Sequence, residues 1–261
     1  MKELTFPEIG LNLKINNIAI SILGIEIYWY AIFIVLAIAI SILFCKKDNN
    51  KYGIQFEYIL ELFIIVIPIS IICARLYYVL FKFEYYINNP IQILNIRNGG
   101  LAIYGGIIGG VITIAFFCKI KKINTIDVLD YIGPYLPLGQ AIGRWGNFFN
   151  VEAYGTETTN LLRMGIIENG IYKEVHPTFL YESISCFMIF ILLYILRNKR
   201  KYRGQIIFIY LALYGLTRTL IEGLRIDSLM IWNLKISQII SIIIFLISIF
   251  ILIFNFFSRK F

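Results

Sequence analysis

The chain has 261 residues, of which 59% are apolar and only 15% are charged, and its formal net charge is +8. Its mean hydropathy of +0.77 lies far outside the range of a water-soluble domain of this length. The composition therefore excludes a soluble globular domain and predicts an integral membrane protein.

Seven apolar runs each reach about the 20 residues that an α-helix needs to cross a bilayer. They cover residues 18–45, 55–81, 101–120, 126–146, 178–196, 204–222 and 236–257. A backbone in lipid must satisfy its own hydrogen bonds, and runs of this length without alternation exclude a β-barrel. The sequence thus predicts an all-α polytopic membrane protein with seven transmembrane helices, in a single domain over residues 1–261.

Lysine and arginine residues indicate the orientation, because short cytoplasmic loops carry an excess of both. Dense clusters follow the first, third, fifth and seventh runs, and they contain Lys46, Lys47, Lys51, Lys119, Lys121, Lys122, Arg197, Lys199, Arg200, Lys201, Arg203, Arg259 and Lys260. This pattern places the N-terminus outside and the C-terminus in the cytoplasm, with a small outward-facing segment at about residues 147–176. Since much of the positive charge then sets the topology, it does not indicate a nucleic-acid partner.

The four cysteines, Cys45, Cys73, Cys118 and Cys186, all lie in apolar runs. They form no CxxC pair and have no histidine nearby at ligand spacing. We therefore expect small core residues, and neither a metal nor a cofactor.

Residues 143–155, GRWGNFFNVEAYG, place a dense group of polar side chains at the end of an apolar run. Its polar members are Arg144, Asn147, Asn150 and Glu152. A charge at bilayer depth costs about 2.5 to 3.5 kcal/mol, so this stretch predicts a functional site. Gly133, Pro134 and Pro137 break the same run, and irregular backbone at this depth is tolerated only where it lines protein or water. We therefore expect a cavity near Arg144.

A polar stripe extends along the outer half of the sixth run and ends just beyond it. Tyr210, Tyr214, Arg218, Glu222 and Arg225 are separated by four, four, four and three residues, which places them on one helical face. Arg218 and Glu222 suit a simple intrahelical ion pair. The position of the stripe at the outer end of the run, level with Arg144, favours a shared polar cavity instead.

Four further residues each allow a structural and a functional interpretation. Tyr30 suits an aromatic belt at the membrane surface. Arg75 either extends to the headgroups or faces the bundle and meets an anion there. His176, the only histidine, precedes Pro177 and suits a helix cap. Tyr104 lies in the glycine-rich stretch at residues 99–106, where the glycines suit close helix packing and the phenol can hydrogen-bond a headgroup.

Together these residues resemble the prolipoprotein diacylglyceryl transferases of bacterial cytoplasmic membranes. The resemblance rests on Trp29 and Tyr30, GGLAIYGG at 99–106, the stretch at 143–155, HPTFLYE at 176–182 and RTLIEGLR at 218–225. It implies seven spans with an outward N-terminus and an active site near the outer face. The implied reaction, the first step of lipoprotein maturation, moves an sn-1,2-diacylglyceryl group from phosphatidylglycerol to the lipobox cysteine of prolipoproteins in the bilayer. A thioether and glycerol 1-phosphate result.

By this resemblance the candidate catalytic residues are Tyr104, Arg144, Asn147, Glu152, His176, Arg218 and Glu222. The candidate substrate-binding residues are Tyr30, Arg75, Arg144, Gly155, Arg218 and Arg225. Arginine suits a phosphate because its planar fork binds two oxygens and does not deprotonate. Some relatives carry histidine at the position of Tyr104, and a phenol with a pKa of about 10 does not replace it as a base. His176, Tyr104 and the departing phosphate all remain candidate proton acceptors.

Two other classes of protein are compatible with an intramembrane charged site. A small transporter predicts internal repeats and polar residues through the full depth of the bilayer, and the sequence has neither pattern. A noncatalytic assembly factor explains the membrane topology but not the concentration of arginines suited to phosphate.

Overall fold

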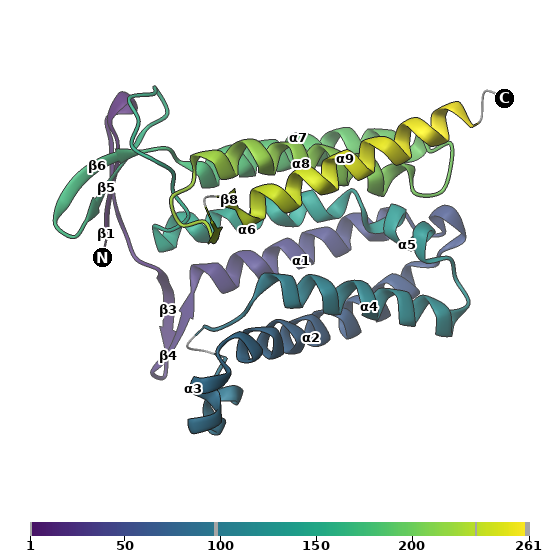
Figure 1. Cartoon of the computed structure of the whole chain (residues 1–261), viewed down its shortest axis with the longest axis horizontal. Helices are drawn as coiled ribbons and strands as arrows, with labels where there is room; N and C mark the ends of the chain where they lie inside the picture. Colours follow the sequence, from purple (N-terminus) through teal and green to yellow (C-terminus); the bar gives the residue numbers. More distant parts are fainter. Residues whose placement is uncertain (1, 97–98, 233, 259–261) are drawn as a thin grey trace. The chain divides into compact units, whose positions relative to one another are not determined.

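The computed structural model describes residues 2–96, 99–232 and 234–258 (Figure 1). Of the basic residues used to predict the orientation, Arg259 and Lys260 lie outside the described residues. The helices are α1 (Trp29–Lys47), α2 (Phe56–Phe81), α3 (Phe83–Asn88), α4 (Ile103–Lys121), α5 (Thr125–Ile132), α6 (Tyr135–Asn150), α7 (Thr178–Leu196), α8 (Gln205–Leu224) and α9 (Ile236–Phe257). The described chain is therefore mostly helical, as its composition predicts.

Within the described residues, six helices are long and apolar enough to cross a membrane: α1, α2, α4, α7, α8 and α9. The predicted polytopic membrane protein is confirmed by these six helices. The run at 126–146 is instead divided into α5 and α6 at Gly133 and Pro134. Proline lacks an N–H and its ring clashes with the preceding turn, which accounts for the break. The total of seven spans and the orientation remain predictions.

The predicted start of the first span at residue 18 is wrong, because α1 begins at Trp29. Residues before it form an antiparallel hairpin of β3 (Ile18–Ile22) and β4 (Ile25–Tyr28). Leu23 and Gly24 join the strands with φ angles of 51° and 80°. Two consecutive left-handed residues are typical of a tight hairpin turn. The apolar run 18–45 therefore begins as a β-hairpin and becomes helical only at Trp29.

A second departure from the all-α prediction is a four-stranded antiparallel sheet. Its strands are β1 (Lys2–Phe6), β2 (Leu11–Ile15), β5 (Met164–Glu168) and β6 (Ile171–Val175), in the order β2-β1-β5-β6. Leu4 pairs with Ile166 across the central strands, and both pack in a buried cluster with Phe148 of α6 and Phe179 of α7. The sheet therefore supports the ends of the two helices that carry the site. A further short hairpin, β7 (Met230–Ile231) and β8 (Leu234–Lys235), precedes α9.

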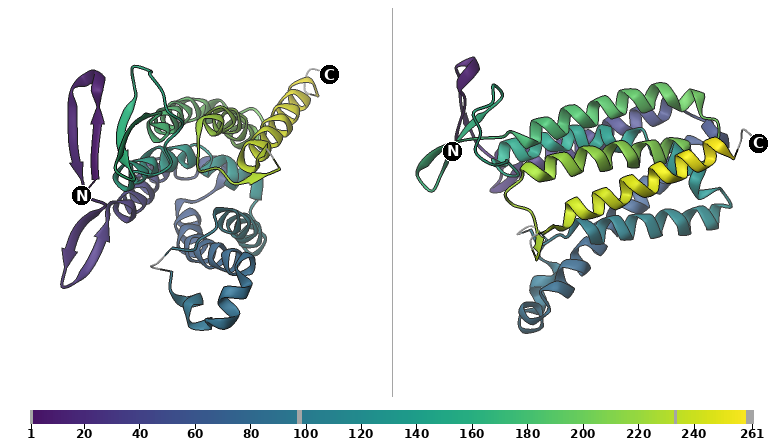
Figure 2. Two further views of the ribbon diagram at one scale, coloured as in Figure 1. Left: turned by 60° about the vertical axis from the view of Figure 1, so that its left-hand side comes forward. Right: turned by 45° about the horizontal axis from the view of Figure 1, so that its top comes forward.

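The chain divides into two compact units, which are residues 1–44 with 130–261, and residues 45–129. In the first unit, α6 packs against α7, α7 against α8, and α8 against α9 (Figure 2). In the second, α2 packs against α4. A Cβ atom on Gly105 of α4 would lie 2.5 Å from the carbonyl oxygen of Cys73, so glycine permits this close approach, as expected for the glycine-rich stretch at residues 99–106.

Asp130 fixes the start of α8 within the first unit. This fully buried carboxylate accepts hydrogen bonds from the backbone N–H groups of Gly204 at 2.7 Å and Ile207 at 2.9 Å. It also pairs with Arg200, whose Nε lies 2.9 Å away. A carboxylate at a helix N-terminus satisfies N–H groups that have no partner inside the helix. Asp130 thereby anchors the helix that carries Arg218.

Candidate active site

The polar end of α6 is joined to the loop that follows it. Nδ2 of Asn147 donates to Oε1 of Glu152 at 2.8 Å, and Nδ2 of Asn150 donates to the same oxygen at 3.1 Å. Oδ1 of Asn147 accepts a hydrogen bond from Nη1 of Arg144 at 3.1 Å. Glu152 therefore orients Arg144 through Asn147 rather than by direct contact.

Glu182 of α7 is the centre of the site, although the sequence analysis did not single it out. Its side chain is 2% exposed, and Oε1 accepts a hydrogen bond from Nη2 of Arg144 at 2.5 Å. Oε2 accepts one from Nη1 of Arg218 at 2.8 Å, and the hydroxyl of Tyr214 donates to Oε1 at 3.2 Å. Two guanidinium groups from different helices thus meet on one buried carboxylate.

The stripe on α8 extends this network. Nη2 of Arg218 lies 2.5 Å from a carboxylate oxygen of Glu222, four residues along the helix. Arg225 follows the end of α8 and donates from Nε and Nη2 to the two carboxylate oxygens of Asp227, at 3.0 and 2.9 Å. Its Nε also lies 4.0 Å from Glu222. A continuous chain of polar contacts therefore runs from Glu152 through Arg144 and Arg218 to Glu222, which we call the arginine network.

Lys235 closes one end of the network. Its Nζ donates to the carbonyl oxygens of Glu222, Gly223 and Arg225, at 2.8, 3.1 and 2.6 Å. A cation at a helix C-terminus offsets the partial negative charge there and satisfies free carbonyl groups. The last turn of α8 is thus fixed where Glu222 lies.

The arginines of the network retain binding capacity. A guanidinium group has five N–H donors. Arg144 contacts two described acceptors, Asn147 and Glu182, and Arg218 contacts Glu182 and Glu222. The two side chains are 22% and 14% exposed, so part of each remains accessible. This arrangement suits an anion that bridges two guanidinium groups, such as a phosphate.

Two glycines allow other segments to approach the network. A Cβ atom on Gly146 of α6 would lie 2.5 Å from Cδ2 of Tyr30, so the tyrosine ring packs directly against this helix although the residue is 40% exposed. A Cβ atom on Gly155 would lie 2.8 Å from Cβ of His176 and 2.9 Å from the carbonyl oxygen of Leu224. Gly155 also donates its N–H to the carbonyl oxygen of His176 at 2.9 Å. Both glycines therefore serve close packing beside the site.

His176 does not cap α7 as its position before Pro177 suggested. The N-cap residue is Pro177 itself, and no side chain caps this helix. Nδ1 of His176 lies 3.2 Å from the hydroxyl of Tyr181. Partial burial lowers the pKa of His176 from its usual value of 6.5, so the ring is neutral near pH 7. A neutral imidazole is able to accept a proton.

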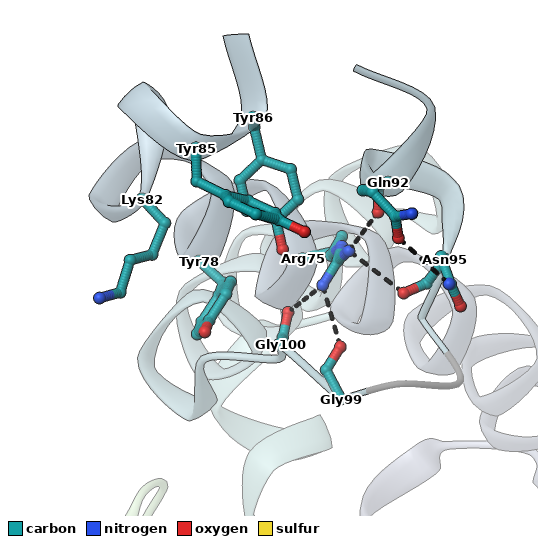
Figure 3. A pocket seen from close by; sticks show the side chains of 9 residues that line it. All are labelled: Arg75, Tyr78, Lys82, Tyr85, Tyr86, Gln92, Asn95, Gly99 and Gly100. Atoms are coloured by element: carbon teal, nitrogen blue, oxygen red, sulfur yellow. Dashed lines mark hydrogen bonds between the residues drawn. The ribbon is translucent and has the colours of Figure 1, made fainter. Parts of the chain in front are cut away.

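Arg75 and Tyr104 belong to the second compact unit, whereas every member of the arginine network belongs to the first. Tyr104 is half-buried in the first turn of α4. The Arg75 side chain is 6% exposed and donates to backbone carbonyl groups of its own unit (Figure 3).

An apolar cavity of about 660 Å³ lies beside α6 in the first unit. It is lined by side chains of α1, α6 and α7, including Phe33, Trp145, Phe148 and Phe187. Trp145 and Ser183, which also line it, directly follow Arg144 and Glu182 in the chain. Apolar volume therefore lies next to a charged site.

Fold and site together define a multi-pass helical membrane protein with a buried network of arginines and carboxylates. The sequence model of one family, described as prolipoprotein diacylglyceryl transferase, matches residues 17–254, and the chain belongs to this family. A relative from Clostridioides difficile (strain 630) is 46% identical over 228 residues, which are 87% of this chain and 90% of the relative. One from Finegoldia magna (strain ATCC 29328 / DSM 20472 / WAL 2508) is 47% identical over 230 residues, which are 88% of this chain and 91% of the relative.

Both relatives are named phosphatidylglycerol--prolipoprotein diacylglyceryl transferase. A further relative of this name, from Clostridium novyi (strain NT), is 42% identical over 246 residues, 91% of this chain and 95% of the relative. The predicted family is thus confirmed. The chain is a membrane-embedded transferase of lipoprotein biosynthesis.

Proposed function

We propose that this protein transfers the sn-1,2-diacylglyceryl group of phosphatidylglycerol to the thiol of the lipobox cysteine in prolipoprotein signal peptides. The products are a thioether-linked prolipoprotein and glycerol 1-phosphate. The observation that carries this proposal is the convergence of Arg144 and Arg218 on Glu182, which presents two guanidinium groups to one anion. The names of the relatives support the same donor and acceptor.

The chemistry requires fixed positive charge beside the phosphate. The cysteine thiol loses its proton, and the sulfur attacks the glyceryl carbon that is bonded to the phosphodiester oxygen. A C–S bond forms while the C–O bond breaks, and the leaving phosphate changes from one negative charge towards two. Arg144 and Arg218 therefore stabilise the transition state more than the bound lipid, which is the condition for catalysis.

The remaining members of the network position these two arginines or contact the lipid. Glu222 orients Arg218 directly, and Glu152 orients Arg144 through Asn147. Asn147 is a neutral donor to the headgroup. Tyr30, Gly155 and Arg225 border the network and contribute to substrate binding; the separate contribution of Arg75 is considered below.

The proton of the thiol needs an acceptor. A free cysteine has a pKa of about 8.5, and adjacent cations lower it and increase the thiolate fraction. His176, whose pKa is lowered by partial burial, is neutral near pH 7 and so competent to accept the proton. Tyr104 and the departing phosphate are the other candidates.

The lipid substrate has an apolar part that also needs a place. The cavity beside α6 is apolar and lies next to Arg144, so it suits an acyl chain of the donor. We also propose that α5 and α6 form the seventh, broken span. The N-terminus is then outside, the C-terminus is cytoplasmic, and the site lies near the outer face of the bacterial cytoplasmic membrane.

A reconstituted assay tests the reaction. Purified protein is mixed with headgroup-labelled phosphatidylglycerol and a lipobox peptide, and a peptide with serine in place of cysteine is the control. We expect labelled glycerol phosphate and a peptide heavier by one diacylglyceryl group, in equal amounts, with the cysteine peptide alone. Release of the label without peptide modification would indicate a phospholipase and overturn the proposal. Movement of intact lipid between vesicles without either product would indicate a transporter.

A further inference from the structure

Arg75 gives every N–H group of its guanidinium to backbone carbonyl groups within residues 92–95 and 99–100. Nε donates to the carbonyl oxygen of Ile93 at 3.0 Å. Nη1 donates to Gly99 at 2.9 Å and Gly100 at 2.8 Å, and Nη2 donates to Gln92 at 2.5 Å and Asn95 at 3.2 Å. Figure 3 shows four of these carbonyl groups converging on the guanidinium. A phosphate has no N–H left to accept from while these five bonds persist.

Arg75 lines a small cavity in its own unit, and tyrosine rings on one side of this cavity cover the guanidinium. Its Cζ lies 5.1 Å from the ring centroid of Tyr86, which is 6% exposed, and 6.0 Å from that of Tyr78. Lys82 also lines this cavity, but its side chain is directed away from Arg75 (Figure 3). Arg75 is therefore enclosed by its own unit.

Gly99 and Gly100 suit this arrangement in both their backbone conformation and the space around them. Gly99 and Gly100 have φ angles of 83° and 77°, which L side chains rarely adopt. A Cβ atom on Gly100 would lie 2.2 Å from Nη1 of Arg75. The glycine pair thus lets two consecutive carbonyl groups reach one guanidinium nitrogen.

The segment held by Arg75 leads directly into α4. The N–H of Ala102 donates to the carbonyl oxygen of Ala74 at 3.0 Å, which attaches the chain to α2 next to Arg75. The helix then begins at Ile103 and carries Tyr104 in its first turn. Arg75 and Gly100 therefore fix where α4 starts.

We propose that Arg75 is a positioning residue that locks the start of α4, and with it Tyr104, rather than a ligand of the substrate anion. The effect on turnover rests on the proposed transferase function, whereas the lock itself does not. An ammonium group has three N–H donors and no planar fork, so Arg75→Lys retains the charge but not the lock. Gly100→Ala retains Arg75 but displaces its guanidinium.

The test combines hydrogen exchange with steady-state kinetics on the full protein in detergent or nanodiscs. We expect Arg75→Lys and Gly100→Ala each to raise amide exchange at least tenfold in peptides over residues 99–110, with α7 and α8 unchanged. We expect kcat to fall at least tenfold while KM for phosphatidylglycerol changes less than twofold. Both variants disrupt the same interaction between Arg75 and the chain before α4. The kcat of the double variant should therefore fall at most a further twofold below that of either single variant. Lys82→Met removes a cation from the same cavity and should behave like the wild type in both measurements.

Three results would overturn the inference. The first is a raised KM with unchanged kcat and unchanged exchange in Arg75→Lys, which would make Arg75 an anion ligand. The second is wild-type exchange and kinetics in both single variants. The third is a double variant whose fold-loss in kcat equals the product of the fold-losses in the two single variants. If the wild-type protein transferred no diacylglyceryl group, the proposed function would fail, and the exchange result would still decide whether the lock exists.

Discussion

Nη2 of Arg144 lies 2.5 Å from a carboxylate oxygen of Glu182, although 38 positions separate the two residues in the chain. The other oxygen of Glu182 accepts from Arg218. Two guanidinium groups this close would repel each other in an environment of low dielectric constant without an anion between them. Glu182 therefore holds both arginines in place, as the proposed phosphate site requires.

Glu182→Gln should damage both stability and turnover. The amide keeps the size of the side chain but removes the charge between Arg144 and Arg218. Loss of one partner from a buried ion pair costs about 3 to 5 kcal/mol, and we expect a drop in stability of about 3 kcal/mol. Transfer should fall at least 100-fold. Thermal unfolding in detergent and the reconstituted assay measure the two effects.

Glu61→Gln is the matched control for this substitution. Glu61 pairs with Lys121 at 2.6 Å, but its side chain is 44% exposed. Exposed ion pairs contribute about 0 to 1 kcal/mol, so this variant should unfold and turn over like the wild type. Transfer by Glu182→Gln within threefold of the wild-type rate would show that the shared carboxylate is dispensable.

Arg218→Lys should abolish most turnover while the protein stays folded. A lysine retains the charge beside Glu182 and Glu222 but lacks the planar fork that binds two phosphate oxygens. The loss of one stabilising donor at a developing anion costs about 100- to 1000-fold in kcat, and we expect an effect of that size. Arg163→Lys is the control, because Arg163 pairs with Glu174 of β6 and with Glu8 in the turn between β1 and β2, outside the arginine network. Equal kcat in the two variants would refute the phosphate clamp.

Of the seven membrane spans predicted from the sequence, six are long apolar helices among the described residues, because lipid imposes length and hydrophobicity on each one. It predicted poorly where short-range geometry overrides hydrophobicity. Residues 18–28 are apolar, yet the alternation of isoleucines around Leu23 and Gly24 indicates a hairpin. Asn169 and Gly170, with φ angles of 52° and 79°, connect β5 and β6 in the segment expected to be only a polar outward stretch. The Asn-Gly pair was readable as a turn from its residue types, whereas Leu23 is not a residue type that favours a positive φ angle.

Most of the arginine network was also predictable, since Arg144, Asn147 and Glu152 share one motif and Arg218 and Glu222 share one helical face. Glu182 was not singled out, because it has no charged neighbour at helical spacing in α7. Its partners come from α6 and α8, and only the tertiary fold brings them together. A lone carboxylate in an apolar span was the available signal.

The pH dependence of transfer should reveal the role of His176. Partial burial lowers its pKa below 6.5, so the ring is neutral above that pH and becomes protonated only in more acidic solution. If His176 accepts the thiol proton, the rate should rise with pH through the lowered pKa, and His176→Gln should remove that limb. Tyr181→Phe removes only the hydroxyl beside Nδ1 and should keep the limb. A profile of the same shape in His176→Gln would exclude histidine as the base.

The same titration has a defined effect on stability. Because the pKa of His176 is lower in the folded protein than in the unfolded chain, the unfolded chain binds more protons between the two values. The contribution of His176 is therefore fully present above about pH 6.5 and is lost as the pH falls through the folded pKa. Thermal unfolding at pH 7.5 and 5.5 should show a smaller acid-induced loss in His176→Gln than in the wild type.

Gly146→Ala and Gly143→Ala form a matched pair within one helix and one motif. A Cβ atom on Gly146 would lie 2.5 Å from the ring of Tyr30, whereas one on Gly143 meets no described atom within 4 Å. Overpacking costs about 1 to 3 kcal/mol, and we expect Gly146→Ala to unfold earlier and to lose at least tenfold in turnover as Tyr30 moves away.

Gly143→Ala should instead be neutral or stabilise α6 by about 0.5 to 1 kcal/mol, because alanine favours a helix over glycine. Thermal unfolding and the transfer assay compare the two variants directly. If the two substitutions changed the unfolding temperature and the transfer rate equally, the contact between Tyr30 and Gly146 would contribute to neither stability nor turnover. A folded but inactive Gly143→Ala would instead show that a substrate approaches α6 on the open side of Gly143.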